Sequence, residues 1–351
     1  MRTCLILMRR LWMWLLLCGL SGAVLPDCSN LHTDCAPADI ECNGWATILL
    51  AHTVRNTVFI ANYTGNIHYS YNGVSWSFPN QVTGNVINRF AYGNGLIVGV
   101  GNNGAIVYSA NLENWTLAAS PTANALNGIT YGNERFVAVG ASNTVLVSGD
   151  GINWTLETIG AGISLQDVGY ADGLFVTSRI LSTDIYYSTT GLSGTWQQKT
   201  IPSSNHLAFG NGRWVFSDGV GNIIVYSSDL NNVLYANAAA SAGSNDLIFT
   251  DGAFYSMSAA GGTVSRSLNG DDATWQVFAT GCPSAGTAQA ISALACIDQR
   301  CVIVGNDNSA NRAMCTSSNG TAGSFTNITP VAGNPTYGIV QALDLGPGLQ
   351  F

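Results

Sequence analysis

Charged side chains and long apolar runs are both scarce in this chain of 351 residues. Asp, Glu, Lys and Arg make up 9% of the sequence, and Lys199 is its one lysine. The few charges, together with 40 glycines and many small polar residues, favour short strands and tight turns over long amphipathic helices. The apolar run from Leu11 to Leu20 is too short to cross a bilayer as a helix. We therefore expect no membrane-spanning segment.

The N-terminal residues are typical of a secretory signal. Arg9 and Arg10 precede the apolar run, and Ser21 and Ala23 place small residues at −3 and −1 of a cleavage site. Cleavage after Ala23 would export the protein to the periplasm or the cell exterior, and the loss of three arginines would change the formal charge from −8 to −11. So acidic a chain is a poor binder of nucleic acid or anionic membranes, which we exclude as partners.

Cysteine is absent from residues 43–281. Seven cysteines follow the predicted signal, in two terminal groups: Cys28, Cys35, Cys42, Cys282, Cys296, Cys301 and Cys315. In an oxidising compartment they predict disulfides, with one thiol left over or paired between molecules. No CxxC motif occurs and no histidine has ligand spacing to the cysteines, so we expect no metal site. No sequence feature requires a cofactor.

The strongest pattern in the sequence is an internal repeat. Residues 127–154, NGITYGNERFVAVGASNTVLVSGDGINW, match residues 88–115, NRFAYGNGLIVGVGNNGAIVYSANLENW. Further copies begin near Gln166, Asn205, Asn245 and Ser292, and a divergent first copy begins near Ile48. Each copy has a strand ending in Tyr or Phe, a Gly/Asn/Asp turn, a second strand, a third strand ending in Ser, another turn, and a strand that opens with Trp.

Four strands per copy, with no helical pattern between copies, are typical of β-propeller blades. We predict an all-β fold consisting of a single β-propeller of seven four-stranded blades, with six or eight blades as alternatives. The predicted organisation is a signal peptide at 1–23, a cysteine-containing segment at 24–44 and the propeller at 45–351. The strand Tyr337–Leu345 should complete a terminal blade, because a ring without edges needs its ends joined.

The second turn of each copy resembles the Asp-box of BNR, sialidase-like and Ycf48-like propellers. The best match is SGDGINW, Ser148–Trp154, and related turns lie at 70–76, 109–115, 188–196, 267–275 and 317–325. Only the third and fifth copies keep an Asp at its usual place, and the fifth (Ser227–Val233) loses the aromatic residue. The resemblance implies a structural element whose Trp packs between blades; these residues are Trp76, Trp115, Trp154, Trp196 and Trp275.

One disulfide follows from aligning the copies on RFVAVG. The alignment places Cys296 and Cys301 at the positions of Tyr131 and Phe136, an aromatic or apolar pair that faces across a hairpin in other copies. Cysteines at opposed positions lie close enough to bond, so we predict a Cys296–Cys301 bridge. The pairing of the other cysteines stays open, although bridges between the two terminal groups would staple the ring.

Two adjacent positions in the first strand of each copy are expected to have different roles, the first structural and the second functional. At the first position a side-chain amide recurs, and we interpret it as a structural group that ties blades or turns together: Asn88, Asn127, Gln166, Asn205 and Asn245. The next position varies: Arg89, Gly128, Asp167, His206, Asp246 and Ala293. The first strand of a blade is usually innermost, so Arg89, Asp167, His206 and Asp246 should converge at one mouth of the central channel as a ligand-binding site. The alternative is a solvated mouth without a ligand.

These features favour a non-catalytic role: an exported propeller that binds a protein partner or a glycan, or an assembly or scaffold module of the cell envelope. A carbohydrate-active enzyme, either a glycoside hydrolase or a polysaccharide lyase with its site at the channel mouth, is the alternative. Sialidase chemistry needs a Tyr activated by a Glu, and the four glutamates outside the signal lie in the cysteine-rich segment or in and beside turns. No catalytic residue is assigned, and the oligomeric state stays open.

Overall fold

The computed structural model describes residues 57–345 apart from 64, 161, 180–181, 219–221, 240–243, 259–261, 272–273, 281–289, 307–311, 320–324 and 329–338. The predicted signal peptide and cysteine-containing segment lie outside the described residues. The described chain is nearly all β, and its one helical element is a 3-10 turn, η2 (Asn102–Gly104). No helix in this part of the chain has the length and apolarity to cross a membrane.

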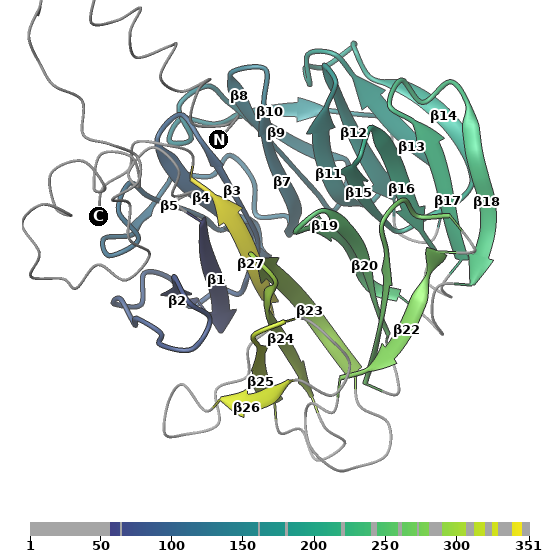
Figure 1. Ribbon diagram of the computed structural model, residues 1–351. Helices are drawn as coiled ribbons and strands as arrows, with labels where there is room; N and C mark the ends of the chain where they lie inside the picture. The colour runs from purple at the N-terminus through teal and green to yellow at the C-terminus, as the bar shows by residue number, and fades with distance from the viewer. Residues whose placement is uncertain are drawn as a thin grey trace, which may run out of the picture. The chain divides into compact units, whose positions relative to one another are not determined.

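The strands form seven antiparallel sheets, which confirms the predicted seven-bladed propeller (Figure 1). We number the blades in chain order. Blade 1 contains β1 (Thr57–Tyr63), β2 (Asn66–Ser70) and β27 (Ile339–Asp344). Blade 2 contains β3 (Ile87–Gly93), β4 (Leu96–Gly101), β5 (Ile106–Ser109) and β6 (Thr116–Leu117). Blade 3 contains β7 (Leu126–Gly132), β8 (Arg135–Gly140), β9 (Thr144–Ser148) and β10 (Thr155–Thr158).

The later blades repeat this order. Blade 4 contains β11 (Leu165–Ala171), β12 (Leu174–Arg179), β13 (Ser182–Ser188) and β14 (Gln197–Ser204). Blade 5 contains β15 (His206–Gly210), β16 (Arg213–Ser217), β17 (Asn222–Ser227) and β18 (Val233–Ala239). Blade 6 contains β19 (Ser244–Thr250), β20 (Ala253–Ser258), β21 (Thr263–Ser267) and β22 (Gln276–Ala279). Blade 7 contains β23 (Ala290–Ile297), β24 (Arg300–Asn306), β25 (Arg312–Ser317) and β26 (Thr326–Ile328).

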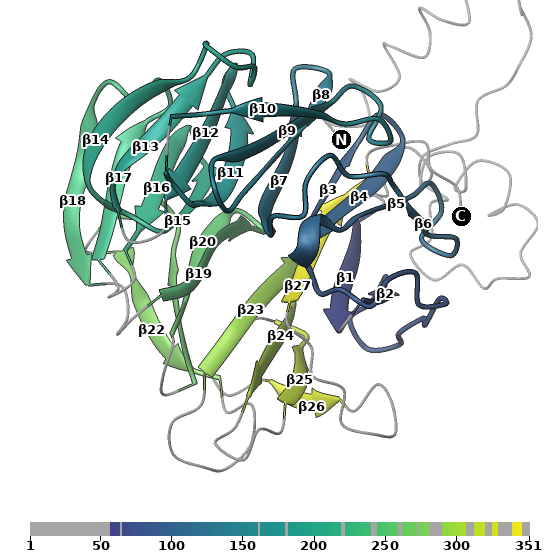
Figure 2. The same ribbon diagram turned by 180° about the vertical axis from the view of Figure 1, so that it is seen from behind.

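The ring closes through the C-terminal strand. β27 pairs antiparallel with β1 and takes the innermost place in blade 1, which confirms the predicted completion of a terminal blade (Figure 2). On its other side the Gln341 side chain accepts a hydrogen bond from the Phe90 N–H at 2.6 Å and so links β27 to β3. In place of a full fourth strand, Ser77 forms a single β-bridge with Tyr69. The two ends of the chain therefore share one blade, which removes the exposed edges of an open ring.

Apolar side chains fill every junction between successive blades. The seven core clusters each combine side chains from two neighbouring blades, including the junction of blade 7 with blade 1. Alternate residues of a strand point to opposite faces, and both faces of a blade meet a neighbour, so runs such as β8 are buried from Phe136 to Gly140. The hydrophobic core of this protein thus consists of apolar layers between neighbouring blades, arranged around the ring.

The second turn of each copy, which resembles the Asp-box and is here called the box turn, lies beside these apolar layers. In blade 3 the Asp150 carboxylate accepts hydrogen bonds from the backbone N–H groups of Ile152 and Asn153, and Gly151 takes the left-handed φ of 75° that the turn needs. The Trp154 indole donates to the Gly151 carbonyl and packs against the cluster of blades 2 and 3. Trp115, Trp196 and Trp275 make the matching indole bond in their own turns. Trp76 packs against the cluster of blades 7 and 1, with its indole nitrogen buried and without a hydrogen-bond partner.

Blade 5 replaces its missing box aromatic with a residue from another strand. Trp214, on β16, is fully buried and occupies the position of Phe136 in blade 3. Its indole donates to the Ser228 carbonyl at 3.0 Å, inside the box turn that lacks a Trp. Its ring packs with Phe209 and fills the junction between blades 4 and 5. One Trp thus supplies both the apolar plug and the hydrogen bond to the turn.

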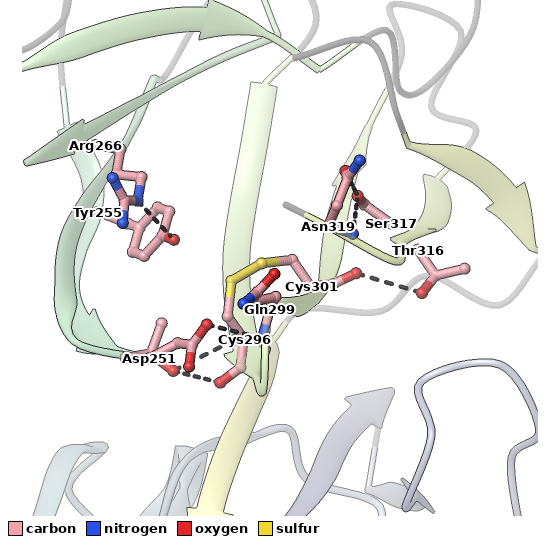
Figure 3. Close-up of a disulfide and its surroundings, with 10 residues drawn as sticks. Asp251, Tyr255, Arg266, Cys296, Gln299, Cys301, Thr316, Ser317 and Asn319 are labelled. Atoms are coloured by element: carbon pink, nitrogen blue, oxygen red, sulfur yellow. Dashed lines mark hydrogen bonds between the residues drawn. A yellow bond between two sulfur atoms is a disulfide. The ribbon is translucent and has the colours of Figure 1, made fainter. Parts of the chain in front are cut away.

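Blade 7 contains the predicted cross-strand disulfide. Cys296 and Cys301 face each other on β23 and β24, with 4.1 Å between their Cα atoms, and form an S–S bond (Figure 3). Blades 3 to 6 place pairs of aromatic rings in tilted or edge-to-face contact here, such as Tyr131 and Phe136. The bridge lies in the layer between blades 6 and 7, where the Thr250 hydroxyl donates to the Cys296 carbonyl at 2.6 Å. Cys315, buried in the same cluster, is also disulfide-bonded, and its partner lies outside the described residues.

Replacing both Cys296 and Cys301 with Ala should lower the stability of blade 7, because the bridge fills a position that two aromatic rings occupy elsewhere. We expect a lower melting temperature for the double variant under non-reducing conditions. Peptide mapping of the unreduced wild-type protein should recover a peptide joined through Cys296 and Cys301. Recovery of both residues as free thiols, or in bridges to other cysteines, would contradict the structure.

Asp150→Ala should weaken the box turn of blade 3 by about 1 kcal/mol, the usual cost of losing a side-chain cap on backbone N–H groups. The hydrogen bonds of this turn also lower the pKa of Asp150, so the stabilisation is present at neutral pH and is lost as the carboxylate is protonated in acid. Urea unfolding at pH 7 measures the difference, with Asp172→Asn as the control, because it removes an exposed carboxylate and keeps a residue that tolerates the left-handed φ of this hairpin tip. Equal stability of Asp150→Ala and wild type would show that the turn does not depend on this carboxylate.

Candidate functional site

The innermost strands bring the four predicted site residues to one end of the ring axis. Arg89, Asp167, His206 and Asp246 each lie at or near the start of β3, β11, β15 and β19. Before Arg89, Asp167 and Asp246 the pairing register shifts by one residue, which marks a β-bulge. Bulges re-aim the side chain that follows, and the same shift recurs in blades 3 and 7. In five of the seven blades a bulge of the repeated framework therefore precedes the variable position.

The residue at the bulge is the recurring amide. Asn88 donates to the Leu126 carbonyl and Asn127 to the Leu165 carbonyl, both at 2.8 Å, so each amide ties its inner strand to that of the next blade. In blade 4 the Ser178 hydroxyl makes a link of this kind by donating to the Asn205 carbonyl. The side chain of Asn245 lies outside the described residues.

The charged residues contact one another across the ring. The Arg89 guanidinium, from blade 2, lies 2.6 Å from the Asp246 carboxylate of blade 6 (Nη2 to Oδ1). His206 of blade 5 places its Nδ1 atom 3.6 Å from the same oxygen. A ligand atom from each of Asp167, His206 and Asp246 lies within 4.8 Å of the others. His206 and Asp246 are buried, whereas Arg89 and Asp167 are partly exposed.

Burial and crowding perturb the titration of this cluster. Burial raises the pKa of Asp167 to about 7, helped by the Asp246 charge and opposed by Arg89 and by the backbone N–H groups of Val168 and Leu207. Burial also lowers the pKa of His206, with Asp246 opposing and Arg89 adding to the effect. For Arg89, burial acts to lower the pKa, but the attraction of Asp246 and Asp167 outweighs it and the pKa is raised. Near neutral pH the imidazole is neutral, the guanidinium is charged and Asp167 is close to half protonated.

In two of the copies the residue at the variable position contributes to packing between blades. Gly128 faces the inner strand of blade 4, where a Cβ atom would lie 3.0 Å from the Asp167 Cα, a tighter contact than side chains usually make, so glycine eases this approach. Ala293 is buried in the layer between blades 7 and 1. Only four of the six variable residues thus reach the cluster.

The two faces of the ring differ in what they contain. One, which we call the box face, carries the box turns and the tips between the first two strands of each blade; the other, the connection face, carries the links between blades and the turns between second and third strands. On the box face Arg135 donates to the Thr190 carbonyl and Arg213 to the Asn269 carbonyl, each in the box turn of the next blade. The charged cluster lies towards the connection face. Framework contacts therefore concentrate on the box face.

A second ion pair on the connection face was not part of the predicted site. Arg179, at the end of β12, lies 3.1 Å from the Asp184 carboxylate on β13, and the Thr200 hydroxyl donates to the same carboxylate. The only indication of this ion pair in the sequence is that Arg179 departs from the residues that the other copies have at its position. Asp167, His206 and Asp246 form the one group in the described part of the chain whose donors have the spacing to hold a metal ion.

Comparison with known proteins identifies the fold. No protein-family model and no curated protein sequence matches the chain. Among solved structures it is similar to Ycf48 bound to D1 peptide, with a TM-score of 0.56 and 14% identity over 78% of this chain and 84% of that one. Ycf48 from Cyanidioschyzon merolae has a TM-score of 0.54 and 14% identity over 71% of this chain and 88% of that one. The WD40 β-propeller domain of Doa1 has a TM-score of 0.52 and 13% identity over 78% of this chain and 88% of that one. These likenesses place the chain among the β-propellers.

Replacing Asp167 with Asn should change how stability depends on pH. The carboxyl has an ordinary pKa of 3.8 and a folded pKa of about 7, so between these values the folded protein keeps a proton that the unfolded chain releases. The wild type therefore loses stability as pH rises from about 4 to about 7, and Asn removes this loss. The unfolding free energy of Asp167→Asn relative to wild type should rise by a few kcal/mol between pH 4.5 and pH 8.

Urea titrations of both proteins at several pH values, with a chelator present, measure this change. Asp172→Asn, in an exposed tip of the same blade, is the matched control. A difference between Asp167→Asn and wild type that stays constant across the range would contradict the perturbed pKa.

Proposed function

We propose that this protein is a non-catalytic propeller that binds a segment of a protein partner on its connection face, around Arg89 and Asp167. The observation that carries the proposal is the convergence of four variable residues from four blades at one end of the axis. Each stands where the copies differ, on a framework of bulges and amides that the copies share. Binding residues are commonly positioned in this way by a rigid scaffold.

The division between the two faces supports this choice. On the box face, turns, indoles and hairpin-tip arginines bond to one another, as Arg135 does to Thr190 and Arg213 to Asn269. On the connection face, partly exposed Arg89 and Asp167 present a guanidinium and a carboxyl group close together. Such a pair suits a polar peptide segment with both donors and acceptors.

The structural neighbours are compatible with such a role. One of them is a Ycf48 structure with a bound D1 peptide, so a propeller of similar fold accepts a peptide. A fold hosts many functions, and an identity of 14% transfers none of them. The box turns suggest in the same way a divergent member of the BNR/Asp-box group, whose boxes serve the framework.

Export is part of the proposal. The Cys296–Cys301 disulfide supports a protein that folds in an oxidising compartment, because disulfides are rare in the cytosol. The sequence of residues 1–23 then acts as a cleaved signal, and the periplasm or the cell exterior is the site of action. N-terminal sequencing of the secreted protein should begin at Val24.

A neutral double variant, Arg89→Gln with Asp246→Asn, tests the binding site. It removes both charges of the buried pair together and so avoids leaving one uncompensated. The wild-type chain should capture a defined protein from envelope extract, and a peptide of that protein should bind in calorimetry. We expect the double variant to weaken this affinity at least about tenfold, as loss of a buried charged contact does.

Arg300→Gln, at an exposed tip of the box face, is the matched control and should bind as the wild type does. Loss of binding in the control with retention in the double variant would place the site on the box face. A glycan array and an assay for glycan cleavage run beside it. Glycan binding or cleavage that requires Asp167 and Asp246, with no peptide binding, would replace the proposal with a carbohydrate-binding or carbohydrate-active role.

A further inference from the structure

The cluster at the axis has a donor set suited to a metal ion. Asp167 and Asp246 offer carboxylate oxygens and His206 offers an imidazole nitrogen, from three successive blades. Mixed imidazole and carboxylate donors favour divalent transition metals such as Zn²⁺. Ca²⁺ and Mg²⁺ prefer oxygen donors alone. The composition of the cluster therefore selects a class of cation.

The spacing of the donors is close to that of a bound ion. His206 Nδ1 and Asp246 Oδ1 are 3.6 Å apart, near the roughly 3.3 Å between two ligands on a tetrahedral zinc ion with bonds of about 2.0–2.1 Å. All three candidate ligand atoms lie within 4.8 Å of one another. The Asp167 side chain, which is partly exposed, would have to come closer to the other two donors to complete such a site.

His206 supplies an independent indication of a missing partner. Its side chain is buried, with 4% of the residue exposed, and its Nδ1 atom has no hydrogen-bond partner. Buried polar nitrogens in native proteins are nearly always satisfied, because an unpaired one keeps the full cost of desolvation. This nitrogen faces the Asp246 carboxylate at a distance too long for a hydrogen bond. A cation between the two groups would supply the partner that the imidazole nitrogen lacks.

Arg89 occupies the place where a cation is needed. Its guanidinium lies 2.6 Å from Asp246 Oδ1 and is attracted by both carboxylates. In a cluster with two acidic groups this positive charge partly compensates the burial of Asp246. Arg89 is also the more exposed partner of the pair, with 16% of its side chain accessible against 4% for Asp246, so it is the partner that lies nearer to solvent.

We propose that Asp167, His206 and Asp246 bind one divalent transition-metal ion, and that Arg89 is the internal cation that competes with it. Metal binding displaces the guanidinium from Asp246 towards the connection face. Three protein ligands leave a coordination position for water or a ligand group. The inference rests on the geometry of the cluster and is independent of whether the connection face binds a protein.

Zinc titration of the full chain tests the site. The protein is oxidised, its residual thiols are blocked with iodoacetamide because thiolates bind zinc tightly, and ZnCl₂ is added in a calorimeter. We expect one Zn²⁺ per chain and a melting temperature that rises with zinc concentration. Asp167→Asn, at a partly exposed position, should weaken binding roughly tenfold or more, and His206→Gln should do the same if it remains folded by circular dichroism.

Arg89→Met gives the opposite and decisive change. Removal of the competing charge should tighten zinc binding several-fold, because the two carboxylates then have no other cation. Asp184→Asn, in the separate ion pair with Arg179 on the same face, is the control and should bind zinc as the wild type does. Absence of one-to-one zinc binding by the wild type, or unchanged affinity in both Asp167→Asn and Arg89→Met, would overturn the proposal. These outcomes are read from zinc alone and leave the peptide-binding test unaffected.

Discussion

The packing of each blade against the next is the interaction on which the rest of the molecule depends. A single four-stranded sheet of this chain has apolar residues on both faces and cannot bury them alone, so each layer of the core belongs to two blades. A layer is missing unless the last blade meets the first, and β27, paired with β1, contributes Val340 to the apolar cluster that fills the junction of blades 7 and 1. Closure is therefore a condition for burying the apolar surface at the ends of the repeat.

The same constraint explains how the blades vary. Each junction needs a large plug beside the box turn, and the plug can come from different places in the sequence. Blade 3 uses Trp154 with the pair Tyr131 and Phe136, blade 5 uses Trp214 from its second strand, and blade 7 uses the Cys296–Cys301 disulfide. The space between blades is filled in every case while the residues that fill it change, as expected for a closely packed core.

The innermost strands combine this framework with the charged cluster. Bulges and bridging amides fix the strand starts, so residues that differ between copies are held at one end of the axis. Arg89 and Asp246 are 157 residues apart in the chain and meet only because the ring brings blades 2 and 6 within reach across its axis. In this confined place the pKa of Asp167 rises and the His206 nitrogen lacks a partner, two features of sites that bind ligands.

The sequence alone predicted seven blades with six or eight as alternatives, the closing strand and the pairing of Cys296 with Cys301, because these follow from local periodicity and from comparing one copy with another. It also indicated the position from which four of the copies contribute a residue to the charged cluster. Only the tertiary structure decided which of these residues touch: that Arg89 reaches Asp246, that Gly128 and Ala293 serve packing, and that Trp214 replaces a lost box aromatic. Contacts across the ring depend on the curvature and closure of the whole assembly, which no single repeat encodes.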